Sequence, residues 1–202
     1  MPRITNLYAM TVFDTTKKIA CFAIASVWLL LTIPRIAISQ SYLTKSGHVE
    51  FDSSVPLHSF TGVSDRLVGK ISLPDSTVDF YVDVNTLETG IGKRDRDMLK
   101  TLDAENHPFA EFYGKLVSDF NPQNNDPQKV IVEGQFTVHG VSKPVTIDGT
   151  LQKTNNGLRV DADWTLNMKD YNIKPPGILF YRVSEKIDLS ISATLPLNTK
   201  AK

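Results

Sequence analysis

Residues 187–195 read IDLSISATL, with an apolar side chain at every odd position and a polar side chain at every even position. A β-strand directs successive side chains to opposite faces of its sheet, so this segment is predicted to bury one face and expose the other. Residues 158–166, LRVDADWTL, follow the same rule. Several such strands in series predict an antiparallel sheet with one apolar face.

Further segments between residues 49 and 151 also carry strand patterns, and turn residues separate them. They are 49–51, 60–63, 67–73, 78–84, 110–116, 130–138 and 145–151, and residues 178–183 are a candidate for one more short strand. The sequence Asn155-Asn156-Gly157 predicts a tight hairpin before residues 158–166. About eight strands without a repeat or a linker predict one all-β domain, either a barrel or a sandwich. If the sheet closes into a barrel, its apolar face lines an interior that can hold an apolar ligand.

One segment breaks the strand pattern. Residues 94–102 place Met98, Leu99 and Leu102 at helical spacing among charged side chains. We therefore expect one short helix there, lying across the sheet or over a barrel mouth, with its charges forming a solvated face. Asp95 and Asp97 do not predict an acid–base pair, because residues two apart on a helix do not face each other.

Two observations leave open whether the interior is packed or hollow. Gly114, Gly134 and Gly149 fall on the inward phase, where glycine either allows sharp sheet curvature or leaves space beside the backbone. Large aromatic side chains share that phase, and aromatics at strand spacing commonly fill a core. The aromatics are Phe51, Phe80, Phe112, Phe136 and Trp164.

Residues 1–39 are predicted to be a signal peptide. Lys17 and Lys18 precede an apolar run over residues 19–33, and Ala37 and Ser39 are the small residues that a signal peptidase reads. The run of 15 residues is shorter than the roughly 20 that a spanning helix needs, although an uncleaved anchor is the alternative. Cleavage after Ser39 predicts a periplasmic or secreted domain over residues 40–202, without a stable membrane span.

The composition of residues 40–202 narrows the class of partner. The whole chain has 22 basic and 22 acidic side chains, of which residues 1–39 hold four and one, so the remainder carries 18 and 21, a net charge of −3. This balance argues against nucleic acid as a partner. The single cysteine, Cys21, lies in the predicted signal peptide, so stability must come from a hydrophobic core rather than disulfides.

Motifs for catalysis are lacking in the sequence. The four histidines are His48, His58, His107 and His139, and no two have the spacing of a metal pair. We find neither a nucleophile elbow nor a glycine-rich phosphate loop. The sequence therefore predicts no catalytic residue, no metal and no cofactor, and hence a protein that is not an enzyme.

Three stretches together resemble the YceI family of polyisoprenoid-binding, lipocalin-like periplasmic proteins. The first is VNTLET at 84–89, followed by Arg94-Asp95 and by DML at 97–99. The second is NHPFAEF at 106–112, and the third is GQFTVHGVSKPV at 134–145. Their order and spacing match the family, and the resemblance extends over residues 47–197.

The resemblance implies a single antiparallel, lipocalin-like β-barrel of about eight strands with one short helix near its mouth. It implies an elongated apolar interior that holds a long-chain apolar lipid, such as a polyprenyl lipid or a quinone tail. The predicted ligand-binding residues are Phe51, Phe80, Val82, Phe112, Phe136, Val160, Ala162, Trp164, Leu189 and Ile191. The alternative is a structural or interaction protein whose barrel is packed and whose surface binds a partner.

Overall fold

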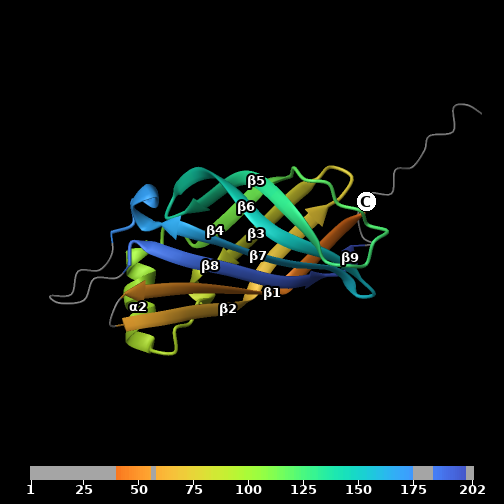
Figure 1. Ribbon diagram of the computed structural model, residues 1–202. Coiled ribbons are helices and arrows are strands. Elements are labelled where there is room, and N and C mark those ends of the chain that lie inside the picture. The colour runs from red at the N-terminus through yellow and green to blue at the C-terminus, as the bar shows by residue number, and fades with distance from the viewer. Residues whose placement is uncertain (1–39, 56–57, 175–183, 199–202) are drawn as a thin grey trace, which may run out of the picture. The chain divides into compact units, whose positions relative to one another are not determined.

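The computed structural model describes residues 40–55, 58–174 and 184–198, and eight of its strands close into an antiparallel barrel (Figure 1). Each strand pairs with its neighbours in sequence, and β1 pairs with both β2 and β8 to close the sheet. The strands are β1 (Ser41–Val55), β2 (His58–Ser72), β3 (Thr77–Asp83), β4 (Phe109–Leu116), β5 (Gln128–Val138), β6 (Val141–Thr154), β7 (Gly157–Asn167) and β8 (Lys186–Leu195). A two-residue strand, β9 (Leu197–Asn198), pairs with the start of β1. The predicted all-β barrel is confirmed.

The predicted extents of the first strands are wrong, because β1 and β2 each run for 15 residues. The register between them shifts at Gly47, opposite Leu67. Buried residues between positions 62 and 71 of β2 are otherwise two apart, but at this point the next buried residue after Ser64 is Leu67, three residues later. A bulge inserts one extra residue and reverses the inward phase, so a search for strict alternation divides one strand into two.

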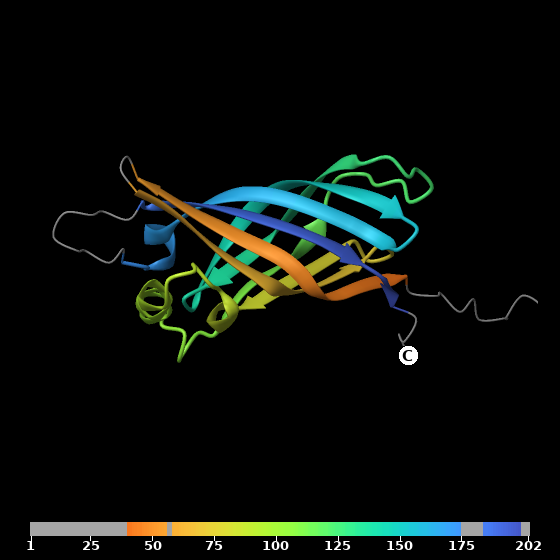
Figure 2. The same cartoon turned by 90° about the horizontal axis from the view of Figure 1, so that it is seen from below.

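The predicted helix is present as α2 (Gly92–Thr101), two residues earlier at its start than expected and one earlier at its end. Asp95 accepts hydrogen bonds from the backbone amide and the hydroxyl of Thr89, which ties the first turn to the preceding loop. Figures 1 and 2 show α2 across one end of the barrel. Two short 3₁₀ turns complete the fold, η1 (Val84–Thr86) and η2 (Met168–Tyr171), so Val84 belongs to a turn rather than to the predicted strand.

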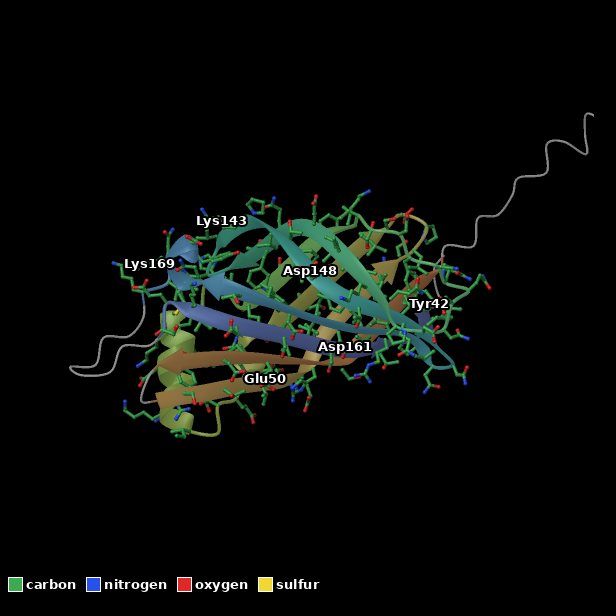
Figure 3. The ribbon with its side chains drawn as sticks, viewed as in Figure 1. Tyr42, Glu50, Lys143, Asp148, Asp161 and Lys169 are labelled. Atoms are coloured by element: carbon green, nitrogen blue, oxygen red, sulfur yellow. The ribbon has the colours of Figure 1, made fainter. Side chains whose placement is uncertain are left out.

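The inward and outward phases agree with the prediction for most of the residues tested. Val82, Phe112, Phe136, Val160, Trp164 and Leu189 line the interior, whereas Glu133, Asp163 and Asp188 are exposed. Figure 3 shows the side chains along the strands, with Glu50, Asp148 and Asp161 labelled. Asp83, which falls on the outward phase of residues 78–84, is half-buried, and its carboxylate accepts a hydrogen bond from the Asn85 amide at 2.9 Å at the start of η1.

The turn predicted at Asn155 and Asn156 is confirmed, because Thr154 and Gly157 pair directly on either side of it. His139 belongs to no strand. It follows β5 with a positive φ of 55°, and its Nδ1 lies 3.0 Å from the carbonyl oxygen of Tyr171. The ring of His139 is therefore held by η2 rather than exposed on a sheet face.

Two sequence predictions, the signal peptide at 1–39 and the short strand at 178–183, lie outside the described residues. Within the described part of the chain, no helix combines the length and apolar character that crossing a membrane requires. The same residues contain no group of three His, Cys, Asp or Glu side chains placed to hold a metal ion.

Candidate functional site: an apolar cavity inside the barrel

The barrel encloses a cavity of about 480 Å³. This volume falls within the range of about 300–1,000 Å³ that is usual for small-molecule pockets. All eight long strands contribute side chains to its wall, so closure of the sheet creates it. The wall is almost wholly aliphatic and aromatic, which suits a ligand whose apolar surface is removed from water at about 25 cal/mol per Å².

All ten predicted ligand-binding residues lie on this wall. They are Phe51, Phe80, Val82, Phe112, Phe136, Val160, Ala162, Trp164, Leu189 and Ile191. The structure brings them together from six strands because each occupies the inward phase of its own strand. Their role toward a ligand stays a prediction.

Other wall residues were not predicted as site residues. Val49, Leu67, Ile71, Val130, Ile147 and Leu151 also line the cavity. Inward phase alone identifies most of these residues, since they alternate with polar neighbours in the same strands. Leu67 begins the predicted strand 67–73 and shares its phase with Ile71, so the bulge just before it does not change its assignment.

Three phenylalanine rings lie against glycines rather than reaching across the interior. Phe51 pairs with Gly62 across β1 and β2, and Phe80 pairs with Gly69 across β2 and β3. A Cβ atom on either glycine would overlap the ring. The absent side chains therefore give each ring a place flat on the wall, which keeps the centre of the barrel open.

The third ring explains two of the glycines noted in the sequence. Gly114 and Gly134 pair across β4 and β5, and the Phe112 ring covers both. A Cβ on Gly114 would also lie 2.8 Å from the Gly134 Cα, too close for any side chain. Close strand approach and space for a ring thus account for this pair together. Gly149 lies on the wall opposite Ala162, where two small residues meet.

Helix α2 supplies charged and polar residues at one end of the cavity. Lys93, Arg94, Asp97 and Thr101 border it, while the side chains of Lys93 and Asp97 remain exposed, as predicted for a solvated face. The Lys93 ammonium lies 3.0 Å from the Asp97 carboxylate and, by donating to it, holds the pKa of Asp97 below its usual range. The pKa of Asp95 is lowered because the Thr89 hydroxyl and amide both donate to its carboxylate.

The opposite end of the barrel is closed by buried side chains. Tyr42 lies at that end in Figure 3 and is only 2 % exposed. The Lys153 ammonium lies 5.0 Å from the centroid of its ring and 3.3 Å from its hydroxyl. Leu158 and Leu195 are completely buried without touching the cavity. Access to the cavity is therefore from the α2 end.

Trp164 contributes more than apolar surface. Its indole Nε1 is buried and finds no hydrogen-bond acceptor among the described residues. The ring packs edge-on against Phe136, at 5.7 Å between centroids, which fixes its place on the wall. An N–H left without a partner in a protein interior is unfavourable by about 1–3 kcal/mol.

Comparison with known proteins agrees with this architecture. The YceI-like domain family model matches residues 40–195. A UPF0312 protein of Pseudomonas putida strain GB-1 is 35% identical over 97 residues, which is 45% of this chain and 46% of that protein. The chain thus spans about half the length of the curated relatives it matches.

Solved structures with the same fold are more distant in sequence. A polyisoprenoid binding domain from Saccharophagus degradans superposes with a TM-score of 0.68 at 18% identity, covering 79% of this chain and 99% of that domain. BcnA from Burkholderia cenocepacia superposes with a TM-score of 0.61 at 15% identity, covering 72% of this chain and 94% of BcnA. At such identities the similarity establishes the fold.

Proposed function

Since this chain belongs to the YceI-like domain family, we propose that it is a non-catalytic carrier that holds one long apolar lipid, most simply an isoprenoid chain, inside its barrel. The observation that carries the proposal is the cavity of about 480 Å³ with a wall of aliphatic and aromatic side chains. A packed barrel, the mark of the alternative interaction protein, would leave no such volume. The polyisoprenoid binding domain of similar fold supports the choice of ligand class.

The physical basis is transfer of an apolar chain out of water. A wall of valine, leucine, isoleucine and phenylalanine supplies contact along the whole chain and needs no reacting group. The three rings that lie against glycines stay at the wall, so they leave the interior open to a ligand. Selectivity in such a site comes from length and width, so an uncharged chain should bind with an affinity that changes little with salt.

A titration tests this proposal. Delipidated protein is titrated with geranylgeraniol, an uncharged isoprenoid alcohol, by calorimetry at low and at high salt. We expect saturable binding of one molecule per protein at both salt concentrations. Absence of binding would favour the interaction-protein reading instead.

We also propose that the protein is exported and cleaved after Ser39. The order of charged, apolar and small residues in 1–39 supports this, and the family match and strand β1 begin directly after it, at residues 40 and 41. N-terminal sequencing of the exported protein should start at Gln40 or within a few residues. A mature protein that keeps residues 19–33 would refute cleavage.

A further inference from the structure

Polar side chains are distributed unevenly around the cavity. Four that border it, Lys93, Arg94, Asp97 and Thr101, all come from α2. Elsewhere the described wall is apolar, apart from the hydroxyl of Tyr81 and the indole N–H of Trp164. Because the end near Tyr42 is closed by buried side chains, a ligand with one polar end places that end beside α2.

The charges of α2 are not balanced at this mouth. The helix carries four basic side chains and two acidic ones. Asp95 is engaged by Thr89, and Asp97 is paired with Lys93. Arg94, in contrast, forms no salt bridge with any described residue, so its positive charge is available to a ligand.

Arg94 is nevertheless held in place. Its guanidinium carbon lies 4.7 Å from the centroid of the Phe60 ring, and Phe60 packs edge-on against Phe51 at 6.0 Å. Both rings line the cavity, so this stacking fixes the guanidinium at the edge of the apolar wall. A cation–π contact restrains the guanidinium through its face and leaves its N–H donors free. These donors lie in one plane and match the oxygens of a phosphate or a carboxylate.

We propose that the mouth beside α2 binds the oxyanion head group of the lipid, a phosphate or a carboxylate, with Arg94 as its charge partner. This inference rests on the proposed function, since it assigns the head group of the same ligand. Arg96 provides a matched control. It lies on the same helix and carries the same charge, yet it is exposed and does not border the cavity.

The experiment compares geranylgeranyl phosphate with geranylgeraniol on delipidated wild type, Arg94→Gln and Arg96→Gln. We expect Arg94→Gln to weaken binding of the phosphate about tenfold or more, as for a lost charged hydrogen bond, and binding of the alcohol less than about twofold. Arg96→Gln should change neither affinity by more than about twofold. Arg94→Lys keeps the charge but loses the planar guanidinium. Its affinity for the phosphate should lie between those of wild type and Arg94→Gln. Thermal melts confirm that each variant is folded.

The outcomes separate this inference from the proposed function. If wild type binds neither probe, the carrier proposal itself fails. If wild type binds the alcohol but Arg94→Gln leaves the phosphate unaffected, only the head-group site is refuted. If Arg94→Gln and Arg96→Gln lose affinity for the phosphate equally, the effect comes from the overall positive charge of α2 rather than from a site at Arg94. That result also overturns the head-group proposal. If inorganic phosphate alone binds as tightly as geranylgeranyl phosphate, the site serves a free anion and the lipid assignment is overturned.

Discussion

Gly69 and Phe80 pair directly across strands β2 and β3, and the Phe80 ring occupies the space where a side chain on Gly69 would lie. The same relationship joins Gly62 to Phe51 on the neighbouring pair of strands. Because these glycines have no side chain, the two rings can lie against the wall of the cavity. An aromatic ring that cannot lie flat must turn toward the centre of the barrel.

This relationship predicts the effect of one methyl group. Gly69→Ala should displace the Phe80 ring into the cavity and weaken binding of geranylgeraniol at least severalfold, measured by calorimetry on delipidated protein. Gly92→Ala is the control, because the nearest atom to its Cβ is Arg96 Nη1 at 3.7 Å, an ordinary contact. If the two variants bind alike, the glycines do not keep the cavity open.

Two small residues on the cavity wall predict where a large side chain would block the cavity. Ala162 pairs with Gly149, and their side-chain positions are 3.1 Å apart if Gly149 is given a Cβ. Ala162→Trp should fill this part of the cavity and reduce ligand occupancy strongly. Asp163→Trp places the same ring on the exposed outer face of the same strand and should leave occupancy unchanged. Loss of binding in both variants would show a general disturbance of β7.

Two buried leucines should differ in their effect on stability. Leu158 is completely buried and does not touch the cavity, so Leu158→Ala should lower the free energy of unfolding by about 3–5 kcal/mol. Leu151 borders the cavity and makes contacts on fewer sides, so Leu151→Ala should lower it by only about 2–3 kcal/mol. Denaturant unfolding of delipidated protein measures both. A larger loss for Leu151→Ala would contradict an open interior.

His48 predicts a pH-dependent contact across the bulge of β1 and β2. Its Nδ1 lies 2.6 Å from the Asp65 carboxylate and its Nε2 3.6 Å from that of Glu50. The hydrogen bond to Asp65 raises the pKa of His48 above its ordinary value of about 6.5. A raised pKa means that the stabilisation is fully present below the unfolded value and is lost as pH rises through the folded one.

A proton NMR titration of the His48 ring checks this contact. The midpoint should lie above about 6.5 in wild type and move down toward that value in Asp65→Asn. Glu50→Gln should cause a smaller decrease, because Glu50 contributes less to the shift than Asp65 does. Identical midpoints in wild type and Asp65→Asn would show that the pair does not form in solution.

Sequence pattern predicted the antiparallel strands and their inward-facing side chains because both depend on a local property, the alternation of side chains along a strand. It left a barrel and a sandwich open, and the resemblance to the YceI family favoured the barrel. Residues such as Val160 and Leu189 could be assigned without knowing which strands pair. The bulge at Gly47 could not, because a register shift is set by the two strands together. The place of Arg94 was missed for a related reason, since its position against Phe60 depends on where α2 crosses the barrel end.

The measurement that tests the carrier proposal most directly is mass spectrometry of the organic extract from protein purified from its native host. Wild type and Ala162→Trp are purified in parallel, so lipids that adhere to any protein appear in both. We predict about one isoprenoid lipid per wild-type molecule and a strongly reduced amount in Ala162→Trp. The same lipids in the same amounts from both proteins, or no isoprenoid lipid from wild type, would contradict the proposal.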